Sequence, residues 1–561
     1  MVDSRGKLLY LIFAIGILIL LTRAFYLQVF KWSTLNFEVQ DLNTRIIQSD
    51  SQRGSIYDRN GKLLAWNEKL FQVYNLSEEI DKQTEELIRE ILKKSDLDLD
   101  SIIDKLNFQR KINLSISAAL AKKLSNIKTL YVQEKSIRKY AHVSLYHILG
   151  YVDIEGNPVM GLEKIHDKIL RGQPGYKIVN LTPMGKIKSI VEETFSIPGD
   201  DIYLTIDLDI QIKAFEELES SGYPGSIIVS DPQNGEIYAL ASFPTPDPNI
   251  FSRGLTNLEY RRLSNNTKKP FINRAISALY PPGSVLKPFI ALSSLEAGLD
   301  PDKTIFSDGR YELKNSKGQV IGSFTDWNLV GHGTTDLIKS LKESVNSYYY
   351  WLGEKYGIDY LKTKSDFYNI TGKTFIDIPG ESSGVFPDQK WKKDKFNEIW
   401  YPGETLNAYI GQGYVLTTPI EILKFYNILA AKGKYYNFHT FLRSSNTLEK
   451  GSSIIHEENL AENYEINNDY LSLILKGLKE VTTPGGTAYD AFKNFPVITA
   501  AKTGTAEVSG GKKPHGWFAG YMPADNPKYS IVVMVENVGY GSHVSAPIAK
   551  NVLDLIVKKG I

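Results

Sequence analysis

The sequence predicts an α+β protein with one transmembrane helix at its N-terminus, an α+β module after it, and a C-terminal domain in which helices flank an antiparallel sheet. Three observations lead to this prediction. A long apolar run follows basic residues close to the N-terminus. Segments typical of strands and of helices are mixed along the rest of the chain. In the last part, strand-like runs lie at both ends with helical stretches between them, so distant parts of the chain must meet in one sheet.

Composition bounds the possible functions. The 561 residues are too many for one ordinary domain, at about 150 residues per domain. The net charge of +1 argues against a dedicated nucleic-acid binder, which needs a strongly basic surface. The chain has no cysteine, which excludes disulfides, thiolate metal ligands and a cysteine nucleophile.

The N-terminal segment, residues 1–30, is expected to be an uncleaved membrane anchor. Arg5 and Lys7 precede an uninterrupted apolar run, Leu8–Leu21. This run is shorter than the roughly 20 residues of a span and resembles the core of a signal peptide. However, no small-x-small cleavage site follows it, and Ala24–Phe30 extends it to spanning length. The basic residues predict a cytoplasmic N-terminus. A cleaved signal and a buried core helix are the alternatives.

The second part, residues 31–198, is expected to begin with a β-hairpin. Asn60-Gly61 is a strong turn signal within RGSIYDRNGKLLA, Arg53–Ala65. Residues 55–57 and 63–64 flank the turn as short strands.

Helices are expected in the next part of this module. Residues 77–130 carry Glu, Lys, Leu and Ile at helical spacing. Residues 150–175 are irregular and rich in glycine around one short helix. The pattern changes near Pro198, where we place the boundary with the third part, residues 199–561.

The third part is expected to contain the antiparallel sheet. Its predicted elements are a strand and helix in 201–218, two strands in 225–242, one strand in 497–508, one strand in 529–537 and a final helix in 546–558.

The first chemical motif is Ser284-Val285-Leu286-Lys287, within the stretch YPPGSVLKPF. On a helix, positions i and i+3 share a face, so the lysine amine can approach the serine hydroxyl. Gly283 and the prolines suit the start of a helix, where free N–H groups and the helix dipole help to stabilise an oxyanion. Ser-x-x-Lys occurs four more times in the chain, so the motif alone does not indicate chemistry.

Two further motifs follow in order. Ser344-Val345-Asn346 is weak alone, because Ser-x-Asn occurs elsewhere in the chain. Lys502-Thr503-Gly504-Thr505 lies in a strand-like run, where a glycine indicates close approach of another group. Its lysine and two hydroxyls could hold a carboxylate. A strand end with a turn glycine is the alternative.

The order Ser-x-x-Lys, Ser-x-Asn, Lys-Thr-Gly, with separations of 60 and 158 residues, resembles penicillin-binding proteins and serine β-lactamases. Other stretches extend the resemblance to class B penicillin-binding proteins over nearly the whole chain. They are RGSIYDRNGKLLA and MGLEKIHDKILRGQPG in the second part, and IVSDPQNGEIYALAS, IGQGYVLTTPIEI and TPGGTAY in the third. DPNIF and HGWFAGYMP look most like the elongation type of this class, and the division type is the alternative.

The resemblance implies an elongated pedestal or dimerisation-type module followed by a penicillin-binding transpeptidase domain with the serine β-lactamase-like fold. It implies acyl transfer on peptidoglycan stem peptides ending in D-Ala-D-Ala, with β-lactams as inhibitors. The implied roles are nucleophile for Ser284, base for Lys287, proton relay for Ser344, contact with the substrate amide for Asn346, carboxylate binding for Lys502, Thr503, Gly504 and Thr505, and an oxyanion hole from the N–H groups of Ser284 and Thr505.

The resemblance also implies partners and a location. We expect a membrane lipid-II polymerase of the SEDS type and scaffold proteins of the elongation complex as partners, and no cofactor or nucleic acid. The expected location is the bacterial cytoplasmic (inner) membrane, with the catalytic domain in the periplasm. A β-lactamase, a β-lactam sensor and a protein that mainly activates a glycan polymerase are the rival interpretations.

Other candidate residues carry less weight. Asp308, Asp326 and His332 have metal-ligand chemistry, but hydrogen bonds within a loop are the preferred interpretation, and no metal is expected.

Four residues outside the motifs are lesser candidates. His515 and Trp517 could shape the substrate rim, with core packing as the alternative for Trp517. Glu404 and Gln412 are expected to be structural.

Overall fold

The structure is a computed structural model that describes residues 4–31, 44–49, 51–95, 97–181, 187–445 and 460–560. The chain divides into two compact units. The first comprises Met1–Gly54 and Arg171–Asp200, and the second comprises Ser55–Leu170 and Asp201–Ile561.

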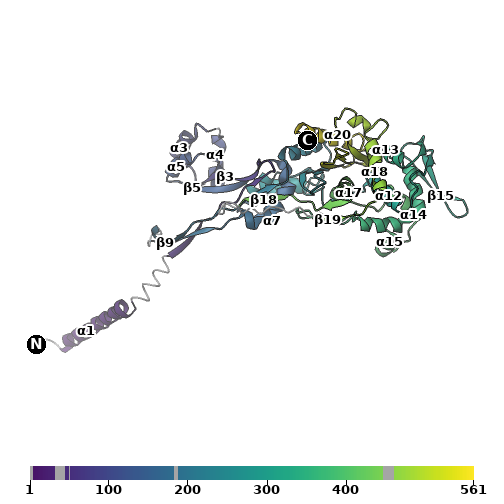
Figure 1. The fold of residues 1–561 in the computed structure, drawn as a ribbon. Coiled ribbons are helices and arrows are strands. Elements are labelled where there is room, and N and C mark those ends of the chain that lie inside the picture. Colours follow the sequence, from purple (N-terminus) through teal and green to yellow (C-terminus); the bar gives the residue numbers. More distant parts are fainter. Residues whose placement is uncertain are drawn as a thin grey trace. The chain divides into compact units, whose positions relative to one another are not determined.

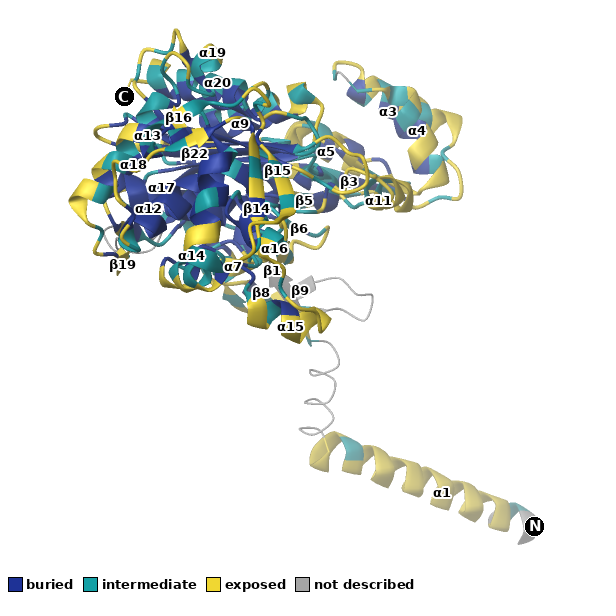
Figure 2. Ribbon diagram, turned by 90° about the vertical axis from the view of Figure 1, so that its right-hand side faces the viewer, coloured by how far each residue is buried: buried dark blue, intermediate teal, exposed yellow. Residues whose placement is uncertain are grey.

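The first unit begins with helix α1, Ser4–Phe25, which continues as a π-helical turn, Tyr26–Phe30. The stretch Leu8–Phe30 is long and apolar enough to cross a membrane by length and composition, and it is exposed along its length (Figure 2). The predicted extension of the apolar run to Phe30 is therefore confirmed. The side chains of Arg5 and Lys7 lie outside the described part of the chain.

The described residues of the first unit also include a three-stranded antiparallel sheet in the order β1-β8-β9. Its strands are β1 Thr44–Ser49, β8 Gly175–Leu181 and β9 Ile187–Thr194.

The second unit contains the predicted hairpin. Strand β2, Ile56–Tyr57, and strand β3, Leu63–Asn75, pair antiparallel around Asn60-Gly61. The turn forms because the Asp58 carboxylate accepts the N–H groups of Asn60 and Lys62 at 2.8 Å. Strand β3 is much longer than predicted, since β5, Leu130–Tyr140, pairs with it from Ala65 to Asn75 (Figure 1).

The helical prediction for residues 77–130 is confirmed by three helices, α3 Lys82–Leu92, α4 Leu99–Phe108 and α5 Ala118–Ser125. Each begins after a side-chain cap, from Asp81, Asp98 and Ser117 respectively. The prediction is wrong at Lys111–Leu114, which forms strand β4 because it pairs with the edge of β3.

The second unit has a mixed sheet in the order β18-β10-β2-β3-β4, with β5 also on β3. Strands β10, Asp201–Leu204, and β18, Phe441–Ser445, come from the third part of the sequence. The N-terminal hairpin is thereby built into a sheet with later segments of the chain.

The predicted antiparallel sheet is confirmed, in the order β12-β11-β22-β21-β20. Its strands are β11 Gly225–Ser230, β12 Ile237–Phe243, β20 Ala500–Ala506, β21 His515–Met522 and β22 Tyr529–Val535. Strand β21 was missed from the sequence. All its residues are buried, so it lacks the polar–apolar alternation that marks a half-exposed strand.

Helices cover both faces of this sheet. Alternate residues of β22 point to opposite faces of the sheet, and each face has its own hydrophobic core. Val533 packs with helices α9, Leu208–Ser221, and α20, Ser545–Lys558. Val532 packs on the opposite side with α12, Lys287–Glu296.

Helices α17, Pro419–Ala430, and α18, Asn468–Glu480, contribute to the same core as α12. Helices α12 and α17 are among the most deeply buried elements (Figure 2). The motif Ser-x-x-Lys therefore begins the helix at the centre of the domain.

The described residues of the second unit form further helices and strands. They are β6 Tyr151–Val152, β7 Pro158–Met160, β13 Ile305–Ser307, β14 Arg310–Lys314, β15 Val320–Thr325, β16 Gly333–Thr335, β17 Lys434–Tyr436, β19 Leu460–Asn463, α6 Tyr146–Leu149, α7 Gly161–Ile165, α8 Asp167–Leu170, α10 Pro248–Ser252, α11 Asn257–Ser264, α13 Leu337–Lys342, α14 Asn346–Phe367, α15 Gln389–Phe396, α16 Pro402–Ala408, α19 Tyr489–Phe492 and the 3₁₀ helices η2 Val143–Leu145 and η3 Gly283–Leu286.

Candidate active site

The candidate nucleophile Ser284 lies in the 3₁₀ turn η3, and α12 begins at Lys287. Gly283 makes this turn possible. Its φ is +57°, and a Cβ atom there would lie 2.7 Å from the carbonyl oxygen of Thr505 on β20. Only glycine fits, so η3 presses directly against the strand that carries Lys-Thr-Gly. Ser284 itself is half-buried.

Lys287 joins the first two motifs. Its fully buried ammonium donates to the carbonyl oxygen of Ser344 at 2.8 Å and to the amide oxygen of Asn346 at 2.7 Å. It also lies 3.3 Å from Ser344 Oγ and over the Tyr349 ring, 4.9 Å from its centroid. The sequence predicted an approach to Ser284. Among the described residues, the hydrogen bonds of this amine run to the second motif instead.

Ser344 has an unusual backbone. Its φ of +59° is left-handed, which costs about 1–2 kcal/mol for a residue with a Cβ atom. Ser344 precedes α14, whose first residue is Asn346. The turn directs the carbonyl oxygen and the hydroxyl of Ser344 to the same amine. Strain of this kind persists where the surrounding structure imposes it, often at functional sites.

Two buried amines lie close enough to interact. Burial lowers the pKa of Lys287 to about 7, although the Asp326 carboxylate acts in the opposite direction. Burial lowers the pKa of Lys502 well below its usual range, and the charge of Lys287 lowers it further. The Lys502 amine donates to the carbonyl oxygen of Thr503 at 3.1 Å. A site of this kind favours a neutral amine that can accept a proton.

Strand β20 is the edge strand of its sheet, so one row of its backbone groups does not pair with β21. The carbonyl oxygen of Thr505 belongs to this row, because it faces Gly283 and accepts from Gln412 Nε2 at 3.4 Å. In an antiparallel strand the N–H and C=O groups of one residue point to the same side. The Thr505 N–H therefore points toward η3, whose first N–H groups, including that of Ser284, have no helical acceptor.

Gly504 shows why the third motif needs a glycine. A Cβ atom there would lie 3.0 Å from the side chains of both Trp517 and Val285. The close approach predicted from the sequence is confirmed. The side chains of Thr503 and Thr505 share the opposite face of the strand, with Thr503 Oγ1 2.6 Å from Thr487 Oγ1.

The other candidates have structural contacts. Trp517 is fully buried and its indole N–H donates to the carbonyl oxygen of Pro281 at 3.1 Å, which confirms the packing interpretation. His515 is also buried, and its Nδ1 accepts the N–H of Asn537 at 3.1 Å. Neither residue forms an exposed rim.

The structural interpretation of Glu404 is confirmed. Its carboxylate accepts a hydrogen bond from the buried Lys392 amine and another from the Tyr401 N–H. Gln412 supports the site strand through its bond to Thr505.

The three metal candidates take part in hydrogen bonds within the protein. Among the residues that the structure describes, no group of three His, Cys, Asp or Glu side chains could hold a metal ion. Asp308 is exposed and accepts the N–H of Arg310. Asp326 accepts two hydrogen bonds from Ser347, and His332 Nδ1 lies 2.7 Å from the carboxylate of Glu343. Loop hydrogen bonds thus account for these residues. Their partners Glu343 and Ser347 had no signal in the sequence.

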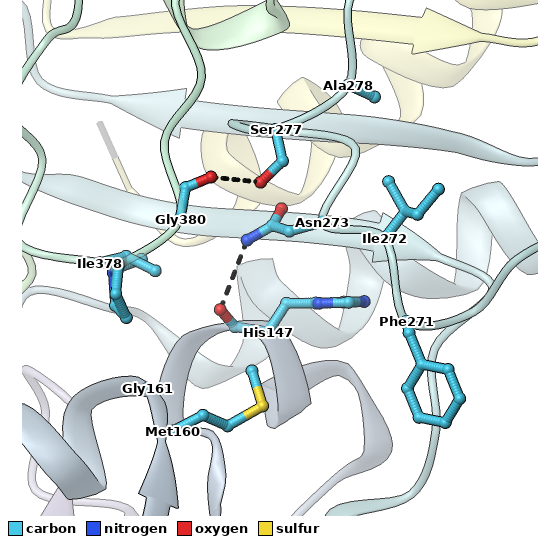
Figure 3. Close-up of a pocket in the computed structure, with 11 residues that line it drawn as sticks. His147, Met160, Gly161, Phe271, Ile272, Asn273, Ser277, Ala278, Ile378 and Gly380 are labelled. Carbon is cyan, nitrogen blue, oxygen red and sulfur yellow. Dashed lines mark hydrogen bonds between the residues drawn. The ribbon is translucent and has the colours of Figure 1, made fainter.

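A separate cavity of about 450 Å³ lies against the chain segment that precedes η3 (Figure 3). His147 and Met160 line one side, and Asn273 and Ser277 line another. Two hydrogen bonds cross its wall, from Asn273 to the carbonyl oxygen of His147 and from Ser277 to that of Gly380. None of the residues that line the cavity belongs to the three motifs.

Comparison with known families agrees with this architecture. Residues 225–554 match the penicillin binding protein transpeptidase domain, and residues 48–204 match the penicillin-binding protein dimerisation domain.

Curated relatives match over nearly the whole chain. The peptidoglycan D,D-transpeptidase MrdA of Haemophilus influenzae is 31% identical, over 96% of this chain and 89% of that protein. MrdA of Acinetobacter baumannii is 30% identical, over 98% of this chain and 87% of that protein.

Solved structures share the fold. The complex between PBP2 and MreC from Helicobacter pylori has a TM-score of 0.73 at 28% identity and covers 92% of this chain and 99% of that chain. Pseudomonas aeruginosa PBP2 in complex with WCK 5153 has a TM-score of 0.69 at 27% identity, covering 91% of this chain and 96% of that chain. A structure of a peptidoglycan synthase complex has a TM-score of 0.73 at 26% identity and covers 98% of both chains.

The motif cluster, the two matched domains and the full-length relatives all point the same way. The predicted class B architecture and the elongation type are confirmed. The chain therefore belongs to the class B penicillin-binding proteins and is a serine-type peptidoglycan D,D-transpeptidase of the elongation type.

Proposed function

We propose that Ser284 is the nucleophile of this transpeptidase. Its hydroxyl attacks the carbonyl carbon between the two terminal D-Ala residues of a stem peptide, and the bond to the last D-Ala breaks. The resulting ester on Ser284 is then attacked by an amine of a neighbouring stem. That attack forms the cross-link and frees the serine. The position of Ser284, half-buried at the start of a buried helix, supports this role.

Lys287 is the base in this proposal. Its amine is neutral at a substantial fraction near neutral pH, since its pKa is lowered to about 7. It accepts the proton of Ser284 as the hydroxyl attacks. The Ser344 hydroxyl, 3.3 Å from this amine, relays the proton to the leaving amine. Asn346 orients Lys287 through its amide oxygen and offers its amide group to the substrate backbone.

Strand β20 binds the terminal carboxylate in this proposal. Thr503 and Thr505 present hydroxyls on one face, and Gly504 allows η3 to approach. Lys502 supplies positive potential, because a bound carboxylate raises the pKa of a nearby amine and favours its charged form. Donors from the N–H groups of Ser284 and Thr505 then stabilise the oxyanion, typically by about 2.7–4 kcal/mol per donor.

One observation supports the assignment most strongly. The buried Lys287 amine contacts Ser344 and Asn346 of the second motif, while the backbone N–H of Lys287 donates to the carbonyl oxygen of Ser284 in the first. Labelling of the full-length protein with a fluorescent penicillin tests it, followed by mapping of the acylated peptide.

Ser284→Ala is expected to abolish labelling. Ser136→Ala is the matched control, because Ser136 and Lys139 form another Ser-x-x-Lys within strand β5, where Ser136 is exposed. Persistent labelling of Ser284→Ala would place the nucleophile elsewhere.

We also infer that residues 1–30 anchor the chain in the cytoplasmic membrane, that residues 31–198 form the pedestal or dimerisation-type module, and that residues 199–561 carry the catalysis in the periplasm. The apolar helix Leu8–Phe30 supports a single span. Protease added to intact spheroplasts should cleave the catalytic domain. Protection of that domain would contradict the orientation.

A lipid-II polymerase of the SEDS type and elongation scaffold proteins are the partners we propose. The solved relatives in complex with MreC and in a peptidoglycan synthase complex support this. An acylation-dead Ser284→Ala protein that still raised polymerase output would reveal an activating role beside cross-linking.

A further inference from the structure

A short loop forms hydrogen bonds to the turn that carries the second motif, on the N-terminal side of Ser344. The loop runs from Asp326 to His332, between strands β15 and β16. The indole N–H of Trp327 donates to the carbonyl oxygen of Glu343 at 3.0 Å. His332 Nδ1 lies 2.7 Å from the carboxylate of the same residue. Glu343 immediately precedes Ser344, so two side chains of the loop hold this end of the turn.

The same loop also forms hydrogen bonds with the residue that follows Asn346, on the C-terminal side of the turn. One carboxylate oxygen of Asp326 accepts both the N–H and the hydroxyl of Ser347, each at 2.9 Å. Asp326 is 2% exposed, and a buried carboxylate is stable only when donors surround it. His332 Nε2 lies 3.5 Å from the other carboxylate oxygen. The turn from Glu343 to Ser347 is thus held at both ends from one loop.

The loop is itself held by hydrogen bonds to an earlier segment of the chain. The Asp326 N–H donates to the carbonyl oxygen of Gly309 at 2.9 Å, and the His332 N–H donates to that of Ser307 at 3.0 Å. The Ser307 hydroxyl also donates to Ser347 Oγ at 3.2 Å. These bonds fix the two ends of the loop on strand β13 and the residues after it. The loop can therefore resist displacement of the turn.

The turn needs such support because Ser344 adopts a left-handed backbone, with φ of +59°. A serine relaxes from this conformation unless the flanking residues are held. Relaxation would rotate the carbonyl oxygen and hydroxyl of Ser344 away from the Lys287 amine.

We propose that Asp326, Trp327 and His332 are positioning residues of the transpeptidase, which hold the Ser344-Val345-Asn346 turn against Lys287. They act through the turn and take no part in bond making. This inference rests on the proposed roles of Ser344, Asn346 and Lys287. It adds to them a group of residues outside the three motifs on which the acylation rate depends.

Trp327→Phe is the sharpest test, because it removes the N–H donor, and the ring atoms lost with it come from a residue that is 52% exposed. Acylation of the full-length protein by a chromogenic β-lactam would be followed by stopped flow, which separates initial binding from the acylation step. We expect the acylation rate constant to fall about fivefold, in line with one lost hydrogen bond. Initial binding and the thermal midpoint should stay close to wild type.

Trp400→Phe is the matched control. It removes an indole N–H bond of similar length, 2.8 Å to Thr405 Oγ1, outside the motif cluster. Its acylation rate constant should equal that of the wild type.

A double-mutant cycle separates positioning from general loosening. Trp327→Phe should have a smaller effect in an Asn346→Ala background than in the wild type, because one of the Lys287 contacts that it supports is already missing. Additive effects of the two changes would contradict the proposal, and so would a wild-type acylation rate in Trp327→Phe. If Trp327→Phe lowers the thermal midpoint markedly, Asp326→Asn and His332→Gln carry the same test.

Different results would refute the positioning role of the loop and the proposed function. If a Ser284→Ala protein is still labelled, the proposed nucleophile is wrong whatever the loop variants do. If labelling maps to Ser284 and the loop variants acylate at the wild-type rate, only the positioning role of the loop is wrong.

Discussion

Gly283→Ala should damage the enzyme through one defined clash. The new Cβ atom would lie 2.7 Å from the carbonyl oxygen of Thr505, which is backbone of strand β20 and cannot swing aside. The left-handed φ of +57° adds about 1–2 kcal/mol for alanine. Overpacking against a fixed group adds roughly 1–3 kcal/mol. The two effects together should lower the free energy of unfolding by about 2–5 kcal/mol.

The same clash should slow acylation. Relief of the overlap moves η3 and β20 apart, and with them the N–H groups of Ser284 and Thr505, which are the proposed oxyanion donors. Loss of one oxyanion donor typically lowers the rate by about 10²–10³-fold. We expect Gly283→Ala to acylate at least about tenfold more slowly, measured with a chromogenic β-lactam beside a thermal unfolding curve.

Gly298→Ala is the control for backbone conformation alone. Gly298 follows the same helix, also has a positive φ, +86°, and has no atom within 4 Å of its hypothetical Cβ. It should lose only about 1–2 kcal/mol of stability and keep the wild-type acylation rate. If Gly283→Ala acylates as fast as Gly298→Ala, the contact between η3 and β20 does not set the oxyanion geometry.

Three further predictions follow from burial. The acylation rate should rise as the pH increases through about 7, because the proposed base Lys287 is neutral above its lowered pKa; a flat profile from pH 6 to 8 would remove that role. Trp517→Phe should cost about 1 kcal/mol of stability through the lost bond to Pro281, with a further loss from the cavity left at this fully buried side chain, and should slow acylation; a wild-type unfolding curve and rate would contradict this. Burial raises the pKa of Glu421 to about 8, so the folded state binds a proton that the unfolded state releases above its own lower pKa. Stability should therefore fall as the pH rises toward about 8 and then level off, and Glu421→Gln should flatten this dependence in thermal midpoints measured across that range.

Local sequence patterns predicted the parts of the fold that form through interactions between neighbouring residues. The hairpin at Asn60-Gly61 forms because a carboxylate two residues earlier accepts the turn N–H groups. The helices between residues 82 and 125 form where capping side chains precede amphipathic runs. The apolar helix at the N-terminus needs only hydrophobic length.

Sequence patterns did not predict the strands whose formation depends on pairing with another strand. Strand β3 is long because β5 lies beside it, and β21 is a strand because it fills the place between β20 and β22. A fully buried strand has no alternation to reveal it.

The candidate site divides in the same way. The sequence by itself was enough to indicate the enzyme class, through the three motifs in order, and to predict which residues carry the chemistry. Tertiary structure alone decided that Lys287 contacts Ser344 and Asn346, that Ser344 is left-handed, and that the loop from Asp326 to His332 holds that turn. The physical reason is that a hydrogen bond or a backbone strain between segments far apart in the chain depends on packing, which no short stretch of sequence contains.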